Sequence, residues 1–234
     1  MKPPEAAAEF DRHAGDYDAQ WRRGLSVSGE DREYFARERV AWFEGRLSRR
    51  GGRPAAVLDY GCGTGITEPF LRTLPGVARV TAVDPSEELL ARASAEHPLD
   101  GVAYVPLGGW RPEGNVDLVY CSGVFHHVPP PEWPATADRL ARALRPGGWL
   151  SFWENSPWSP VARYVMRRIP FDRDAVMISP AVARRMFQEA GFDVARAEFR
   201  FIFPRFLRGL RWLEGGLCRM PFGAQYHLLC RKRE

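Results

Sequence analysis

A short apolar strand that runs into a glycine-rich loop is the feature that most constrains the fold of this chain. Residues 55–58 lead into Asp59, and Gly61, Gly63 and Gly65 follow. A strand that ends in such a loop and continues into a helix brings backbone N–H groups close to a ligand. Glycine suits the loop because the turn takes positive φ and because a Cβ would block the ligand. The segment therefore predicts an α/β sheet with a cofactor at the carboxyl ends of its strands.

The spacing of these glycines distinguishes two classes of cofactor. A dinucleotide fingerprint reads G-x-G-x-x-G, and counted from Gly61 its third glycine would fall at Ile66. The chain instead has G-x-G-x-G, with Asp59 two residues before the first glycine. This spacing argues against an NAD-type oxidoreductase.

Short apolar segments alternate with longer helical ones up to residue 154, which predicts a parallel sheet with helices on both faces. The expected strands cover residues 55–59, 77–84, 101–106, 116–122 and 149–154, and the expected helices cover residues 65–73, 86–96 and 131–144. The later elements are an insertion at 155–176, a helix from Ser179 to Gly191, a strand at 194–203, an apolar helix at 206–220 and a last strand at 224–230.

Charge and cysteine content exclude several classes of protein. The net charge is +4, and arginines alternate with acidic residues, as in segment 31–39, which argues against a nucleic-acid-binding stripe. The four cysteines form no Cys-x-x-Cys pair, so we expect no metal site, and free thiols fit a reducing cytoplasm. The first residues lack the apolar core of a signal peptide, and no apolar run approaches the roughly 18 residues that span a bilayer.

Four segments resemble class I S-adenosylmethionine (SAM)-dependent methyltransferases, especially those of the ubiquinone/menaquinone-biosynthesis type. Residues 59–65 resemble the Asp-x-Gly-x-Gly-x-Gly motif of the family, and residues 117–128 resemble its fourth-strand motif, which ends in His-His-Val. Residues 144–150 resemble its Leu-x-Pro-Gly-Gly turn, and residues 10–17 resemble its N-terminal segment. The resemblance covers residues 10–192 and the last strand hairpin. It implies a Rossmann-like, seven-stranded sheet, mostly parallel with an antiparallel last strand, with SAM as cofactor and S-adenosylhomocysteine (SAH) as product.

The resemblance also implies which residues hold the cofactor. The glycine loop lies against the amino acid and ribose of SAM, and Asp84, at the tip of the next strand, accepts hydrogen bonds from the ribose hydroxyls. Alternatively, Asp84 caps the helix that follows it. An aromatic side chain near Tyr17 closes over the SAM carboxylate, and the tip of the fourth strand lies near the methionine. The expected cofactor-binding residues are Tyr17, Asp59, Gly61, Cys62, Gly63, Gly65, Asp84, Pro85, Cys121 and Ser122.

One departure from the family pattern concerns the adenine. The family usually has an Asp after the third strand, but residues 105–110 contain no acid. We expect recognition of the adenine to depend on backbone groups or on stacking against Trp110.

Two adjacent histidines are the candidates for catalysis. His126 and His127 follow the fourth strand, at the sheet edge where the cofactor is expected. Methyl transfer requires in-line alignment, and it needs a general base only when the acceptor must lose a proton. Because adjacent side chains point in different directions, we expect only one ring in the pocket and favour His126 as the base. Alternatively, both histidines only hydrogen-bond the loop backbone.

The insertion at 155–176 is expected to cover the acceptor. Glu154, at the tip of the fifth strand, and Trp158 and Tyr164, within the insertion, are the expected substrate-binding residues. The alternatives are an ion pair between Glu154 and an arginine, and aromatics that only pack the insertion onto the sheet. The aromatic residues of the insertion suit a small lipophilic acceptor, and Arg163, Arg167 and Arg168 suit an anionic group on it.

Residues 199–220 combine Phe, Leu and Trp with several arginines. Such a segment can cover the sheet, join two subunits, or make a peripheral contact with an anionic membrane. We expect an N-terminal helical lid at 1–50 and a SAM-binding domain at 51–234, in a cytoplasmic monomer or homodimer without a nucleic-acid partner.

The sequence thus predicts transfer of a methyl group from SAM to a small organic acceptor, by O-, N- or C-methylation, in secondary-metabolite or lipid-linked biosynthesis. The alternative is a protein of the same fold that binds SAM in a cyclase-like or non-catalytic role. A tRNA or protein methyltransferase is disfavoured, because residues 121–124 stand where an Asn-Pro-Pro-Tyr-type tetrapeptide would be.

Overall fold

The computed structural model describes residue 11, residues 17–172 and residues 175–234 of the protein. The strands of these residues join in one eight-stranded sheet with the order β3-β2-β1-β4-β5-β8-β6, and β7 also pairs with β8. The strands are β1 Ala56–Tyr60, β2 Arg79–Asp84, β3 Val102–Pro106, β4 Val116–Ser122, β5 Leu144–Asn155, β6 Phe192–Val194, β7 Glu198–Arg200 and β8 Gln225–Lys232.

The pairing within the sheet confirms the predicted fold. Strands β1 to β5 pair with one another in parallel, whereas β8 runs antiparallel to β5 and to both β6 and β7. The strand expected at 194–203 is divided into β6 and β7, which pair with opposite ends of β8. The N–H of Ala195 still bonds the carbonyl of Leu229 at 3.0 Å, so the chain leaves the ladder only after this residue.

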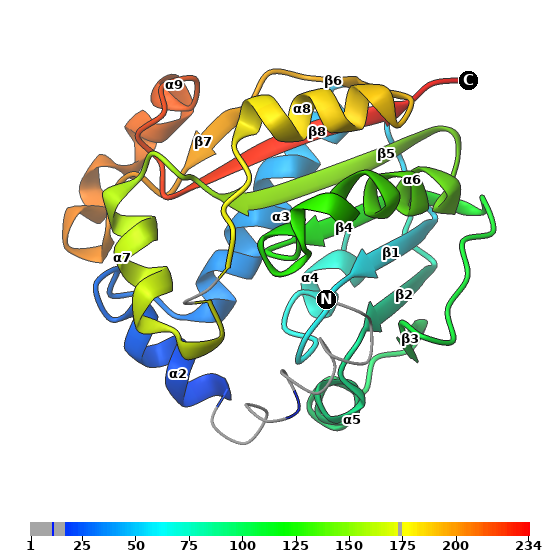
Figure 1. Ribbon diagram of the computed structural model, residues 1–234, viewed down its shortest axis with the longest axis horizontal. Coiled ribbons are helices and arrows are strands. Elements are labelled where there is room, and N and C mark those ends of the chain that lie inside the picture. The colour runs from blue at the N-terminus through cyan, green and yellow to red at the C-terminus, as the bar shows by residue number, and fades with distance from the viewer. Residues whose placement is uncertain (1–10, 12–16, 173–174) are drawn as a thin grey trace.

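Helices cover both faces of the sheet (Figure 1). They are α2 Tyr17–Leu25, α3 Arg32–Ser48, α4 Glu68–Arg72, α5 Glu87–Glu96, α6 Trp133–Ala143, α7 Pro160–Arg168, α8 Pro180–Glu189 and α9 Glu214–Leu217. The 3₁₀ helices are η2 Phe125–His127, η3 Pro130–Glu132, η4 Pro170–Asp172 and η5 Arg205–Leu213. Helix α8 begins as predicted, because the Ser179 hydroxyl accepts the N–H of Val182 at 3.3 Å and Pro180 occupies the first turn.

Alternating side chains of the central strands build two cores, one on each face. In β4, Val119 and Cys121 pack with residues of α6 and α8, whereas Leu118 and Tyr120 pack with residues of α3 and α4. Helix α3 contributes a buried stripe at helical spacing: Ala36, Val40, Phe43 and Leu47. Helix α3 is therefore part of the packed core, although it falls within the segment expected to form a lid.

The segment 199–220 differs from the single apolar helix that its composition predicts. It forms β7, then η5 with an irregular turn at Leu207, and then the four-residue helix α9. Phe206 and Trp212 are 81% and 78% exposed, so this segment covers the sheet only in part. Peripheral membrane contact stays a prediction, and among the described residues no helix is long and apolar enough to span a bilayer.

The direction of the parallel strands determines where the site lies. The parallel strands point toward the side where α2, α7 and α9 gather (Figure 1). Ligands of open α/β sheets bind at this carboxyl edge, next to the paired strands β1 and β4. The chain leads from β1 to β2 on one side of this pair and from β4 to β5 on the other.

Candidate active site

A cavity of about 540 Å³ opens at the carboxyl edge of the sheet. One region of its wall is formed by the loop after β1 and by the tip of β2, and a second region by η2, α7, residues 201–204 and Phe206. Its volume is in the range of sites that enclose small molecules and cofactors.

The glycine loop after β1 has the conformation that its sequence predicts. Gly61, Gly63 and Gly65 have φ values of 84°, 57° and 74°. The N–H groups of Gly61 and Cys62 both bond the carbonyl of Val83, at 2.8 and 3.1 Å, which holds the loop against the tip of β2. A Cβ on Gly61 would lie 2.4 Å from Cγ2 of Val124, so this position also requires glycine for space.

Asp84 joins this loop to the next one. Its Oδ2 accepts the N–H of Gly63 at 2.8 Å, and its Oδ1 accepts the N–H of Ser86 at 2.9 Å. The N-cap of α5 is Ser86, whose hydroxyl accepts the N–H of Leu89 at 3.1 Å, so Asp84 is not the cap. The carboxylate lines the cavity with lone pairs to spare, and burial raises its pKa to about 6.

Two more buried acids lie beneath the loop. Burial, together with the charges of Glu68 and Asp84, raises the pKa of Asp59 well above its usual value. Glu68, the first residue of α4, is fully buried, and burial raises its pKa to about 7. Neither of its carboxylate oxygens has a hydrogen-bond partner among the described residues. In their ionised forms, these three acids around one loop would create a negative potential that suits a cationic ligand, and the glycine pattern gave no signal for Glu68.

Seven of the predicted cofactor residues line the cavity: Asp59, Gly61, Cys62, Gly63, Asp84, Pro85 and Ser122. Gly65 does not, and instead lets α5 approach, because a Cβ there would lie 2.8 Å from Cβ of Ala93. Cys121 is also absent from the wall, because its side chain is fully buried in the core on the other side of β4. Tyr17 begins α2, but its side chain lies outside the described residues.

Trp110 does not reach the cavity. Its ring packs edge-on against Tyr60 with centroids 6.1 Å apart, on the core side. Leu107 lines the cavity instead, and its N–H already bonds the carbonyl of Asp84 at 2.9 Å. This arrangement does not support stacking of an adenine on Trp110, which stays a prediction, and near Asp84 the cavity is lined by backbone groups and the apolar side chain of Leu107.

Both histidines belong to the second region of the cavity wall. They lie in η2, their ring centroids are 4.1 Å apart, and both line the cavity, so the expectation of a single inward ring is wrong. The tight 3₁₀ turn brings the two rings together. Nε2 of His126 and Nε2 of His127 lie 3.5 and 3.2 Å from the same atom, Oδ1 of Asp172. Asp172 comes from η4, within the insertion, and was not predicted.

Glu154 lies behind His126 and not at the cavity wall, contrary to its predicted role in binding the acceptor. Its Oε2 is 2.7 Å from Nδ1 of His126, and its Oε1 accepts the N–H of Phe125 at 2.7 Å. Both oxygens are thus occupied by η2, and the residue is 2% exposed. Glu154 therefore orients the histidine.

The two histidines have opposite pKa shifts. Burial alone would lower the pKa of His126, but the carboxylates of Glu154 and Asp172 outweigh it and raise the value to about 10. Burial, together with the charge of His126, lowers the pKa of His127. The contacts with both histidines overcome burial and lower the pKa of Asp172 to about 2.

The insertion contributes to the cavity through a face that was not predicted. Ala162, Val165 and Met166 of α7 line the cavity, whereas Trp158 and Tyr164 are 53% and 48% exposed and lie outside it. The helical period explains the correction, because position 164 is two residues from both 162 and 166 and faces the opposite side.

An aromatic wall completes the cavity, and the sequence patterns did not reveal it. Phe201 and Phe203 line the cavity from the segment that follows β7. Phe35 of α3 packs on Phe201 with ring centroids 4.8 Å apart. Phe201 has a φ of 62°, which is uncommon for a residue other than glycine. Buried Glu214 accepts the backbone N–H groups of residues 201, 202 and 203 at 3.2, 3.1 and 3.1 Å and so holds this turn.

Helix α2 also forms part of the cavity wall. Trp21 and Leu25 line the cavity, and the Trp21 ring lies 5.9 Å from that of Phe171 in η4. The role of residues 1–50 as a lid stays a prediction, because most of the segment before α2 is outside the described residues.

The family model described as "Methyltransferase domain" matches residues 29–197 of the chain. The chain belongs to this family. Two relatives of this methyltransferase are named trans-aconitate 2-methyltransferase. The one from Mycobacterium tuberculosis (strain ATCC 25177 / H37Ra) is 31% identical over 156 residues, covering 61% of the chain and 58% of the relative. The one from Mycobacterium sp. (strain KMS) is 30% identical over 186 residues, covering 72% and 70%. The chain thus spans less than two thirds of the length of the first of these relatives.

Solved structures support the fold of the methyltransferase. The structure of a DhpI–SAH complex has a TM-score of 0.65 at 21% identity, covering 98% of the chain and 97% of that protein. An S-adenosylmethionine-dependent methyltransferase from Mesorhizobium loti has a TM-score of 0.61 at 20% identity, covering 82% and 98%. The predicted class I methyltransferase fold is confirmed.

Proposed function

We propose that this methyltransferase transfers the methyl group of SAM to an oxygen of a small organic acceptor with an apolar body. The observation that carries the proposal is one continuous cavity that is lined both by the glycine loop with Asp84 and by the His126–His127–Asp172 cluster. SAM would supply an electrophilic methyl group on a positively charged sulfur. The family match and the SAM and SAH named in complexes of fold relatives support this choice of cofactor.

The residues at the glycine-loop end fit that cofactor. Asp84 is placed to accept hydrogen bonds from the ribose hydroxyls while it still holds Gly63. Asp59 and Glu68 supply negative potential near the sulfonium, and Glu68 lacks a partner of its own. The enzyme's main task is then to hold the acceptor in line with the methyl group and to exclude water, which the aromatic wall favours.

The charges of the cavity limit the class of acceptor. Arg32 and Arg211 line it, but each is already paired with an acid, at 2.7 and 2.9 Å. Arg39 and Arg139 also line it, and neither makes an ion pair with an acid among the described residues. Arg39 acts on the pKa of Asp59, so it lies near the glycine loop, where the SAM carboxylate would need a cation. Arg139 lies over the ring of Trp110 at 6.0 Å and acts on the pKa of Tyr60, so it lies beside β1. This small number of arginines without an acid partner suits a hydroxyl or at most a single carboxylate on an aromatic or alicyclic body.

Binding and turnover assays test this function directly. We expect calorimetry to give micromolar binding of SAM and SAH and no binding of NAD. With SAM present, aromatic or alicyclic monoacids and phenols should be methylated faster than trans-aconitate, which carries three carboxylates. Binding of NAD without SAM would contradict the cofactor. Binding of SAM without turnover of any acceptor would favour the non-methylating alternative.

The affinity for SAM should rise with pH between about 5 and 7.5. Burial, with the charge of Asp11, raises the pKa of Asp84 to about 6, and Asp59 and Glu68 lie nearby. SAM favours the ionised carboxylates, so protonation opposes its binding. The stability of the SAM-free protein should change in the opposite direction and fall as pH rises. A carboxyl whose pKa is higher in the folded than in the unfolded state reduces stability as pH rises through the interval between the two values. Calorimetry at pH 5.5 and 7.5 measures the effect, and equal dissociation constants would contradict it.

A further inference from the structure

Three potential metal ligands converge at the acceptor end of the cavity. The donors are Nε2 of His126, Nε2 of His127 and Oδ1 of Asp172, and the ligand atoms of these residues lie within 4.8 Å of one another. Ligand atoms around a four-coordinate ion lie roughly 3.4 Å apart when each metal bond is about 2.1 Å. The two measured separations to Oδ1, 3.5 and 3.2 Å, match that spacing.

Oδ1 of Asp172 contacts both histidine rings without forming a hydrogen bond of standard geometry. Asp172 is 3% exposed, and its Oδ1 has no hydrogen-bond partner among the described residues, although both histidine nitrogens lie near it. A buried carboxylate oxygen normally has such a partner, and its absence is costly. A cation between the three atoms would satisfy Oδ1.

The far side of His126 has the support that metal-binding histidines usually have. Its Nδ1 lies 2.7 Å from Oε2 of Glu154, and Glu154 is fixed by the N–H of Phe125. A carboxylate on the second ring nitrogen fixes the tautomer and directs Nε2 toward the metal. This carboxylate–histidine arrangement is an observation independent of the three ligand distances.

We infer that His126, His127 and Asp172 form a binding site for a divalent transition-metal ion of the zinc type. Two imidazoles and one carboxylate are the protein ligands typical of catalytic zinc and of non-haem iron, both of which keep coordination positions open. All three residues line the cavity, so the open position faces the acceptor space. If the proposed function holds, the ion would bind the acceptor's hydroxyl or carboxylate oxygen and place it for attack on the methyl group.

Metal binding is measured without any turnover. Untagged protein is treated with EDTA, desalted and titrated with Zn²⁺ and Co²⁺ by calorimetry, and visible absorption of the Co²⁺ form reports its ligands. We expect about one ion per chain, with nitrogen and oxygen ligands. His127→Ala and Asp172→Ala should each weaken binding by ~100-fold or more, and Glu154→Gln by ~10-fold.

His97→Ala is the matched control, because His97 ends α5 and does not line the cavity. It should bind both ions like the wild-type protein. Circular dichroism checks that each variant is folded. If Asp172→Ala does not fold, His127→Ala gives the deciding measurement, because His127 is the more exposed ligand, with 19% of its side chain accessible. Lack of uptake by the wild type, equal uptake by His127→Ala, or a Co²⁺ spectrum of thiolate ligands would overturn the inference. SAM titration of the EDTA-treated protein keeps this result separate from the proposed function.

Discussion

Asp84→Ala lowers the affinity for SAM by roughly 100-fold, which corresponds to about 2.7 kcal/mol. The carboxylate makes two backbone hydrogen bonds, at 2.8 Å to Gly63 and 2.9 Å to Ser86, and alanine replaces neither. The glycine loop loses its hydrogen bond from Gly63 to Asp84, and the ribose hydroxyls lose a charged acceptor. A hydrogen bond to a charged group typically contributes about 1.5–3 kcal/mol. Calorimetric titration with SAM measures the change.

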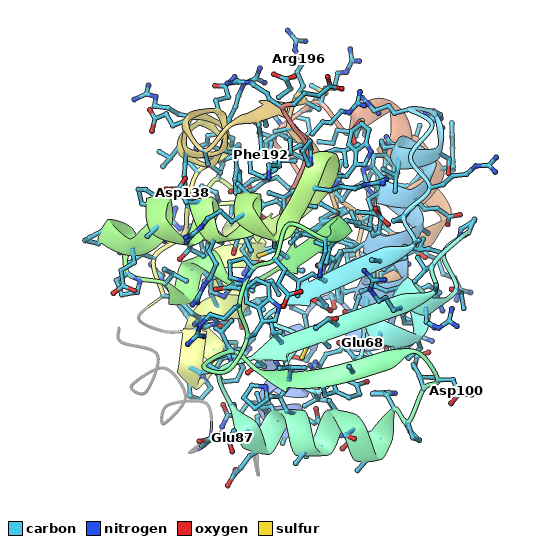
Figure 2. All side chains as sticks on the ribbon, turned by 90° about the vertical axis from the view of Figure 1, so that its right-hand side faces the viewer. Glu68, Glu87, Asp100, Asp138, Phe192 and Arg196 are labelled. Carbon is cyan, nitrogen blue, oxygen red and sulfur yellow. The ribbon has the colours of Figure 1, made fainter. Side chains whose placement is uncertain are left out.

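Two further variants make the Asp84 experiment specific. Asp84→Asn retains one acceptor oxygen and should fall between the wild type and the alanine variant. Asp138→Ala removes an exposed acid of α6, on the outer surface of the molecule (Figure 2), and should bind SAM normally. An Asp84→Ala protein that is folded and binds SAM with wild-type affinity would show that the glycine loop alone holds the cofactor.

Glu154→Ala reduces the free energy of unfolding by about 3–5 kcal/mol, the usual cost of removing one member of a buried charged pair. The substitution leaves the Phe125 N–H without its acceptor and removes the carboxylate 2.7 Å from Nδ1 of His126. For a chain of this size the midpoint of thermal unfolding should fall by roughly 10 °C. Urea denaturation and a thermal melt followed by circular dichroism give the two values.

The controls for Glu154 vary charge and position separately. Glu154→Gln keeps an oxygen for Phe125 and should lose less stability than the alanine variant. Glu189→Ala removes an exposed acid near the end of α8 and should change the unfolding free energy by less than about 0.5 kcal/mol. A Glu154→Ala protein as stable as Glu189→Ala would mean that water replaces the carboxylate and that Glu154 does not position His126.

The features predicted from the sequence are those fixed by local chemistry. The glycine spacing specifies a backbone conformation that the loop after β1 adopts, and Asp84 follows from its register at the tip of β2. The alternation of apolar segments specifies the strands, and Ser179 with Pro180 specifies the start of α8. Each of these depends on residues close together in the chain.

The features missed depend on contacts between distant segments. Asp172 meets His126 across an insertion whose path no periodicity specifies. Glu154 was assigned to the acceptor wall because it ends a strand, but the side on which its carboxylate points depends on η2. Cys121 was misplaced for the same reason, because its side chain packs in the core on the other face of β4. Trp110 lies in the loop between β3 and β4, whose path the sequence pattern does not specify. The expectation of no metal site relied on cysteine spacing, which does not address ligands from η2 and η4, and it stays a prediction that the proposed metal titration tests.

Glu214 has a consequence for how acceptor preference can change. A single buried carboxylate holds three successive backbone N–H groups of the aromatic wall, and the side chains of residues 201–203 do not take part in those bonds. New side chains can therefore be placed at positions 202 and 203 while the turn keeps its path. The cofactor end relies on β1, β2 and their loops, which share no hydrogen bond with this turn among the described residues. Selection, natural or directed, can thus alter acceptor choice here without disturbing the rest of the enzyme.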